Sequence, residues 1–150
     1  LLSAVPIASD SERRRNSNPR KVYPADPGLI RAFDASGRAN LGHALETAVL
    51  NELERRGGEV SYVKTGHGAE VDFLVRHPLA GEELIQVCAE VSDPTTLAHE
   101  LRALEAAALE HPRASRLLLV MDRDALARVP VSGLRVQPAY EWMLEEPGAG

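Results

Sequence analysis

The sequence predicts an α/β fold in which helices flank a mixed central sheet. Apolar residues recur at helical spacing in residues 41–53, and three strand-like apolar segments follow it, at 59–63, 70–76 and 83–91. A second helical stretch comes next, and then residues 116–121, whose run of apolar residues is uninterrupted after Arg116 and is typical of a strand buried on both faces. A helix between two apolar strands can connect parallel neighbours. The order helix, three strands, helix, strand therefore indicates a sheet with helices on its faces.

The first helix is predicted from Leu41, because apolar residues stand at positions 41, 44, 45, 48, 49 and 53. Gly57-Gly58 should end it, since glycine adopts the left-handed conformation of a helix end. Before this helix, Lys21-Val22-Tyr23 is expected to be extended up to Pro24, and one helical turn is expected over residues 29–33.

The three strands are joined by short glycine-containing loops, at residues 65–68 and 77–81, which favour antiparallel hairpins. Asp93-Pro94 predicts the start of the second helix, with Asp as N-cap and Pro at the first helical position. Pro112 should end that helix. A weaker strand over 134–137 and a short helix over 139–145 complete the predicted elements.

Composition and charge limit the classes of protein. A chain of 150 residues fits one domain, and its longest apolar runs are too short to cross a membrane, so we expect no membrane partner. The single Cys88 excludes an internal disulfide and a cysteine-rich zinc site, which suits a cytoplasmic location. The five histidines are dispersed without metal-ligand spacing.

The charge is unevenly distributed along the chain. Residues 1–38 hold seven basic and four acidic residues, a net charge of +3, whereas the remainder holds ten and eighteen, a net charge of −8. The basic stretch is either a solvated linker or an arm that contacts nucleic-acid phosphates. In the second case the contacting residues would be Arg13, Arg14, Arg15, Arg20 and Lys21. We expect residues 1–19 to be a flexible linker, 20–146 the domain and 147–150 a disordered tail.

Two polar residues interrupt the apolar strands. Burying Asp72 or Gln86 without a partner would cost about 2 to 7 kcal/mol, so the pair suggests a site. Strict alternation places Asp72 on the same face as Leu74, and it allows Asp72, Gln86 and Glu90 to converge with Glu46 of the first helix. Carboxylate and amide oxygens suit Mg²⁺, so Glu46, Asp72 and Gln86 are candidate metal ligands. A structural role for Asp72 and Gln86 stays open.

An ordered series of short motifs connects the sequence to a known family. The motifs are Lys21-Val22-Tyr23-x-x-Asp26-x-Gly28-Leu29, Leu45-Glu46, Glu52-Leu53-x-x-Arg56-Gly57, Glu70-Val71-Asp72-Phe73, Ile85-Gln86-Val87-Cys88 and Glu100-Leu101-x-x-Leu104. The series resembles the domain of unknown function that follows the AAA-type ATPase module in prokaryotic ATPases, and it covers roughly residues 20–122. That family is regarded as a branch of the PD-(D/E)XK, or restriction-endonuclease-like, nuclease superfamily.

The resemblance implies a restriction-endonuclease-like αβββαβ core and an upstream ATPase module in the same chain, of which this sequence is then an interior part. In active members a helix Glu, a strand Asp and a Glu-x-Lys bind Mg²⁺ and activate water. Glu46, Asp72 and Gln86 match the first three positions, and Cys88 stands in place of the lysine. A thiol cannot stabilise an attacked phosphate, but Lys64 could substitute spatially. By helical angle Glu52 competes with Glu46 for the position that faces the site.

The leading functional hypothesis is a catalytically degenerate nuclease-like domain that binds nucleic acid or another partner. One alternative is an active Mg²⁺-dependent nuclease, a phosphodiesterase that uses Glu46, Asp72 and Gln86, with Lys64 or bound water replacing the lysine. A second alternative is a structural or oligomerising module, because an acidic body repels DNA. The chain carries no ATP-binding motif of its own.

Overall fold

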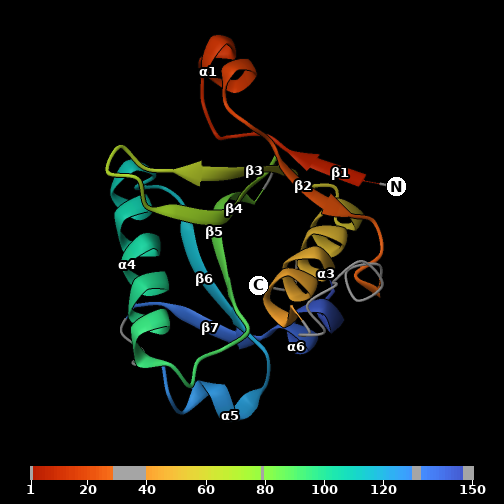
Figure 1. The fold of residues 1–150 in the computed structure, drawn as a ribbon, viewed down its shortest axis with the longest axis vertical. Coiled ribbons are helices and arrows are strands. Elements are labelled where there is room, and N and C mark those ends of the chain that lie inside the picture. Colours follow the sequence, from red (N-terminus) through yellow and green to blue (C-terminus); the bar gives the residue numbers. More distant parts are fainter. Residues whose placement is uncertain (1, 29–39, 79, 130–132, 147–150) are drawn as a thin grey trace.

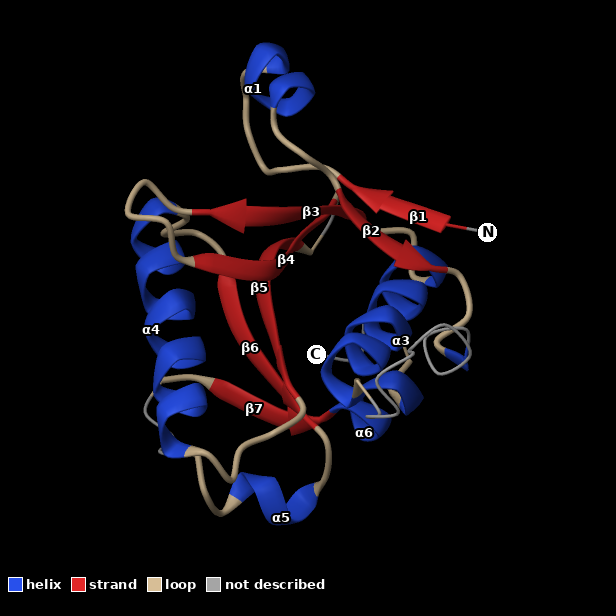
Figure 2. Cartoon of the chain, in the orientation of Figure 1, coloured by secondary structure: helices blue, strands red, loops and turns tan. Residues whose placement is uncertain are grey.

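The computed structural model describes residues 2–28, 40–78, 80–129 and 133–146. These residues form a five-stranded mixed sheet flanked by helices, which confirms the predicted fold class (Figure 2). The strands lie in the order β3 (Glu59–Lys64), β4 (Glu70–His77), β5 (Gly81–Cys88), β6 (Ser115–Val120) and β7 (Arg135–Pro138). The pairs β3–β4 and β4–β5 are antiparallel, whereas β5–β6 and β6–β7 are parallel. The crossover helix therefore connects parallel neighbours, as expected.

The helices begin and end at the signals in the sequence. In α3 (Leu41–Arg55), the Asn40 side chain caps the first turn, and Gly57 follows the last turn with a φ of 73°. In α4 (Pro94–Glu110), Asp93 accepts hydrogen bonds from two backbone N–H groups of the first turn. Two short helices follow, α5 (Arg123–Leu126) and α6 (Ala139–Leu144). The strand predicted over 83–91 ends earlier than expected, because β5 ends at Cys88 and not at Val91.

Helices cover the sheet on two sides, with α3 and α6 on one face and α4 on the other (Figure 1). On the α3 face Phe73, Ile85 and Leu117 pack against Leu50 and Trp142, and all five are buried. On the α4 face a second cluster joins the sheet to that helix, with Val71, Leu74, Leu84, Ala103 and Leu104 as members. The sheet thus separates two apolar layers, and polar groups within it must find partners locally.

The N-terminal segment differs from the flexible linker expected over residues 1–19. Strand β1 (Leu2–Val5) pairs antiparallel with β2 (Lys21–Pro24), and helix α1 (Glu12–Ser17) lies between them in the chain. The next residues run beside β3, where Tyr62 N–H donates to Pro6 O and Ala8 N–H donates to Tyr62 O. Val5 and Ile7 are buried in the core. Residues 2–8 therefore belong to the packed unit, and α1 is the part that stands away from it (Figure 1).

Two expectations lie outside the described residues: the helical turn over 29–33 and the disordered tail over 147–150. Within the described ranges, no helix combines the length and apolar character that crossing a membrane requires.

Candidate functional site

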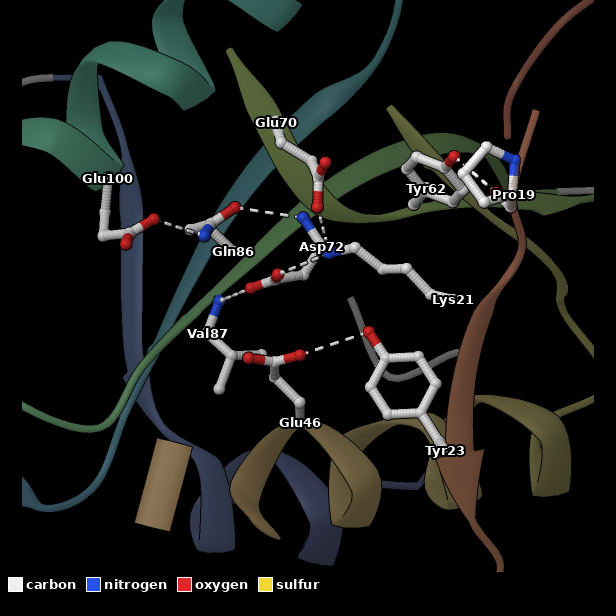
Figure 3. Close-up of polar contacts among 10 residues, drawn as sticks. All are labelled: Pro19, Lys21, Tyr23, Glu46, Tyr62, Glu70, Asp72, Gln86, Val87 and Glu100. Carbon is white, nitrogen blue, oxygen red and sulfur yellow. Dashed lines mark hydrogen bonds and ion pairs between the residues drawn. The ribbon is translucent and has the colours of Figure 1, made fainter. Parts of the chain in front are cut away.

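The candidate site lies where β4 and β5 separate. These strands pair from His77 and Gly81 as far as Phe73 and Ile85, and the register ends there. Beyond that point, hydrogen bonds that involve side chains take the place of the backbone hydrogen bonds between the two strands. The Asp72 N–H donates to Gln86 Oε1 at 3.1 Å, and the Val87 N–H donates to Asp72 Oδ2 at 3.0 Å (Figure 3). We call Asp72, Gln86 and Val87 the strand fork.

A bulge in β4 sets the direction of Asp72. Ser61 pairs with Leu74 and Val63 pairs with Val71, so Tyr62 opposes two residues of β4, Asp72 and Phe73. Leu74 packs on the α4 side of the sheet, whereas the Asp72 carboxylate contacts Lys21 of β2, and Glu46 of α3 lies across from it (Figure 3). The expectation that Asp72 and Leu74 share a face is therefore wrong, because strict alternation does not allow for the extra residue.

The lysine at the fork is Lys21. Its Nζ lies 2.7 Å from Glu70 Oε1 and 3.3 Å from Asp72 Oδ1, and it is 5.6 Å from the centre of the Tyr62 ring. Burial alone would lower the pKa of Lys21, but the Asp72 and Glu70 carboxylates outweigh burial and raise it, so the ammonium stays charged. Lys64 is exposed at the end of β3 and takes part in none of the ion pairs found between described residues.

Asp72 and Glu46 both carry raised carboxyl pKa values. Burial raises the pKa of Asp72, which is 7 % exposed, while Lys21 and the Val87 N–H act against the rise. Burial and then the charge of Asp72 raise the pKa of Glu46 to about 7. The Tyr23 hydroxyl, whose own pKa is raised by burial and by Glu46, donates to Glu46 Oε2 at 3.1 Å. Burial and mutual repulsion thus make these two carboxyl groups harder to ionise, in spite of the charge of Lys21.

Gln86 turns toward the other side of the sheet. Its Nε2 donates to Glu100 Oε2 of α4, and burial followed by the charge of Asp72 raises the pKa of Glu100. Glu100, Glu70 and Tyr23 were not among the expected site residues. The signal for them was present, because all three lie inside the motifs of the family series.

Three other residues from the sequence analysis, Cys88, Glu90 and Glu52, have their side chains outside the strand fork. Cys88 is buried among Leu118 and Val120 on the α4 side, and burial raises the pKa of its thiol to about 11, so it stays neutral. Glu90 is exposed and accepts a hydrogen bond from Ser92, so it does not join the fork.

Glu52 also lies elsewhere. It pairs with Arg55 and Arg56 at 2.7 Å each, so Glu46 is the carboxylate of α3 that faces the fork.

Glu46, Asp72 and Gln86, as placed, do not fit one divalent cation. Asp72 uses one oxygen for Lys21 and the other for the Val87 N–H, and Gln86 Oε1 accepts the Asp72 N–H. Glu46 accepts from Tyr23. In the described part of the chain no cluster of three or more His, Cys, Asp or Glu side chains has the arrangement of a metal site. The ammonium of Lys21 supplies the positive charge at this place.

The basic N-terminal arm, residues 9–20, lies apart from the fork. Arg13, Arg14 and Arg15 are exposed on α1, which buries no residue, and Arg20 is exposed between α1 and β2. Arg14 Nη2 donates to the Lys64 carbonyl oxygen at 3.5 Å, so α1 lies beside the end of β3. Among described residues, none of these four arginines forms an ion pair. Lys21, expected with them, belongs to the fork instead.

Comparison with known proteins adds no relative, since no family model, no curated protein and no solved structure matches this chain.

Proposed function

We propose that this chain is a nuclease-like domain that binds nucleic acid through its basic N-terminal arm without cutting it. The observation that carries the proposal is the set of exposed guanidinium groups on α1, which form no ion pair with other described residues and stand away from the body (Figure 1). Arginine matches the geometry of phosphate oxygens and remains charged at every physiological pH. A short arm with several arginines is therefore suited to contact a phosphodiester backbone.

The fork supports binding rather than cleavage. Metal-assisted hydrolysis needs ligands that hold a cation next to the attacked phosphate. Here both oxygens of Asp72, the amide oxygen of Gln86 and Oε2 of Glu46 form contacts within the protein. The residue at the catalytic-lysine position, Cys88, is a neutral thiol buried against α4. These contacts favour the degenerate form of the nuclease fold.

The acidic body makes the expected binding weak and dependent on salt. Residues 39–150 carry a net charge of −8, which repels phosphate and confines contact to the arm. Four arginine–phosphate contacts, at about −0.7 to −0.9 each, give a slope of log K against log salt concentration of about −3. The dissociation constant should lie in the range of about 10⁻⁴ to 10⁻⁶ M near physiological salt.

Binding of a fluorescent 20-nucleotide single strand and of a duplex, followed by anisotropy between 20 and 200 mM salt, tests this function. The variant R13A/R14A/R15A should lose affinity and most of the salt slope. The matched control R102A/R113A/R128A removes three other exposed arginines and should keep both. An equal loss in the two variants, or no binding by the wild type, would overturn the proposal.

An active Mg²⁺-dependent nuclease is the second candidate, and one observation favours it. Lys21 brings to Asp72 the ammonium group that the motif around Cys88 lacks. Cleavage of DNA or RNA in Mg²⁺ or Mn²⁺, abolished by Asp72→Ala, would establish this candidate in place of the first. The absence of both binding and cleavage would favour the structural or oligomerising module.

The cellular setting follows from the resemblance and the composition. We place the domain beside an AAA-type ATPase module of the same chain, where the arm would hold nucleic acid near the ATPase. A cytoplasmic location fits the single unpaired Cys88.

A further inference from the structure

The fork brings together carboxylates from two elements around one ammonium group. Glu70 and Asp72 come from β4, and Glu46 comes from α3 (Figure 3). Lys21 Nζ contacts Glu70 at 2.7 Å and Asp72 at 3.3 Å. The side chains of Lys21 and Asp72 are 24 % and 10 % exposed, so their charges act on each other with little screening, whereas Glu70, 44 % exposed, is screened more by solvent. Such a set of hard oxygen atoms around a positive charge is also the environment that divalent cations prefer.

Lys21 cannot leave the fork easily, because β2 is held on both sides. Four residue pairs join β2 to β1. Tyr23 is buried, and its ring stacks on that of His43 with centres 5.4 Å apart and lies tilted against that of Phe73 at 5.9 Å. Its hydroxyl donates a hydrogen bond to Glu46. Just before Lys21, the Pro19 carbonyl accepts from the Tyr62 hydroxyl at 2.8 Å. The ammonium is therefore a fixed part of the fork.

An ammonium and a divalent cation would compete for the same oxygens. A metal ion bound to Asp72 Oδ1 and Glu70 Oε1 would have to lie about 2.0 to 2.6 Å from them. Lys21 Nζ already lies within contact distance of both atoms, so the two positive charges would overlap or repel strongly in a half-buried place. Without Lys21, the negative charge of the three carboxylates would have no positive partner at this point.

We propose that the Lys21 ammonium occupies the place of a divalent cation at the strand fork, so that the fork binds such a cation only when this lysine is removed. The proposal goes beyond nucleic-acid binding, which uses the arm, and it stands whether or not the arm binds. It makes Lys21 a built-in counter-ion for the carboxylates of the fork. It also gives a reason for the buried charge of Asp72, which the lysine neutralises without any ligand from solution.

Titration with MnCl₂ at pH 7.5, by calorimetry and by the electron paramagnetic resonance of free Mn²⁺, tests the proposal. The wild type should bind no Mn²⁺ at the fork. Lys21→Met keeps most of the unbranched side chain and removes the ammonium group, and it should bind Mn²⁺ at least about tenfold more tightly than the wild type. The double variant K21M/D72N should lose this gain. Lys21→Arg, which keeps the positive charge, should bind Mn²⁺ no more tightly than the wild type.

Lys64→Met is the matched control, because it removes the other lysine of the chain at an exposed position. It should gain no Mn²⁺ binding. A folded Lys21→Met that binds no more Mn²⁺ than the wild type would overturn the proposal. If Lys21→Met does not fold, Lys21→Gln, which also removes the charge, replaces it in the same titration. Mn²⁺ binding by the wild type that Asp72→Asn abolishes would also overturn the proposal, because the fork would then accept metal beside Lys21. Loss of arm binding in R13A/R14A/R15A affects none of these outcomes.

Discussion

Two carboxylates on one helix behave in opposite ways. Glu46 and Glu52 are both half-buried on α3. Burial and the neighbouring Asp72 raise the pKa of Glu46 to about 7, whereas hydrogen bonds from Arg55 and Arg56 lower that of Glu52 to about 2. Residue type and helix are the same, so the difference comes from the deeper burial of the Glu46 carboxyl and from the partners of each side chain. The charge of Glu52 is neutralised by the neighbouring Arg55 and Arg56, whereas Glu46 lies near a second carboxyl group, that of Asp72.

The surroundings of Glu52 are those of a structural contact. Arg56 binds Glu52, stacks on the Trp142 ring at 4.3 Å and donates to the Trp142 carbonyl at 2.6 Å, which joins the end of α3 to α6. Glu46 instead shares a polar region with Asp72, Lys21 and Tyr23 (Figure 3). Negative charge left in excess is typical of functional sites, while matched charge is typical of structural contacts. This contrast in partners, together with the burial of Glu46, identifies the site.

Removing the fork aspartate should have the largest effect. Asp72→Ala leaves the Lys21 ammonium with Glu70 alone and the Val87 N–H without its acceptor. Loss of one partner from a buried, hydrogen-bonded ion pair should lower the free energy of unfolding by about 3 kcal/mol. Urea unfolding at pH 7, followed by circular dichroism, measures it. Asp72→Asn, which keeps an oxygen for the Val87 N–H, should cost less; equal losses would show that the charge alone matters.

Replacing Glu52 should have the second-largest effect on the free energy of unfolding, and this effect should depend on pH. A carboxyl pKa lowered to about 2 stabilises the fold above the unfolded value of about 4.5, and this stability is lost as the pH falls from 4.5 to 2. Glu52→Gln should therefore lower the free energy of unfolding by about 1 to 2 kcal/mol at pH 7, since the pair is partly screened. The loss should shrink towards pH 2. A loss that stays constant from pH 7 to pH 2 would contradict the ionic contact.

The sequence contained much of the fold because its local signals agree with one another. Asn40, Gly57 and Asp93 mark helix ends, and the apolar run from Leu117 to Val120 marks a buried strand. The N-terminal segment was harder to predict. Its pairing with β3 joins Pro6 and Ala8 to Tyr62, more than fifty residues away, and no local pattern encodes such a distant contact.

The site was predicted in part, for reasons that lie in particular residues. Asp72 and Gln86 stand out as polar residues in apolar strands, and they do meet at the fork. The bulge that turns Asp72 towards Lys21 depends on the register with β3, which alternation along one strand cannot reveal. Lys64 was expected to be the lysine near Asp72 because it ends the neighbouring strand β3, whereas Lys21 lies on β2, which is distant in the sequence. Glu52 could have been excluded earlier, since Arg56 stands four residues after it on the same helix.

The smallest effect should come from Glu46, and its sign should be opposite to that of Glu52. A carboxyl pKa raised to about 7 means that the folded protein loses stability as the pH rises from the unfolded value of about 4.5 through 7, because ionising Glu46 places a charge in a buried position and near Asp72. Glu46→Gln keeps an acceptor for the Tyr23 hydroxyl and removes that charge. The variant should be more stable than the wild type by about 1 kcal/mol at pH 8, and should show no gain at pH 4.

Glu54→Gln is the matched control, because it removes a third carboxylate from α3 at an exposed position, where the Ser3 hydroxyl donates to it. An exposed substitution of this kind should change the free energy of unfolding by less than about 0.5 kcal/mol, at pH 4 and at pH 8 alike. The same urea titrations on all three variants compare the carboxylates directly. A gain at pH 8 in both Glu46→Gln and Glu54→Gln would reflect the net charge of the acidic body. A gain in Glu46→Gln alone would assign the excess charge to the fork.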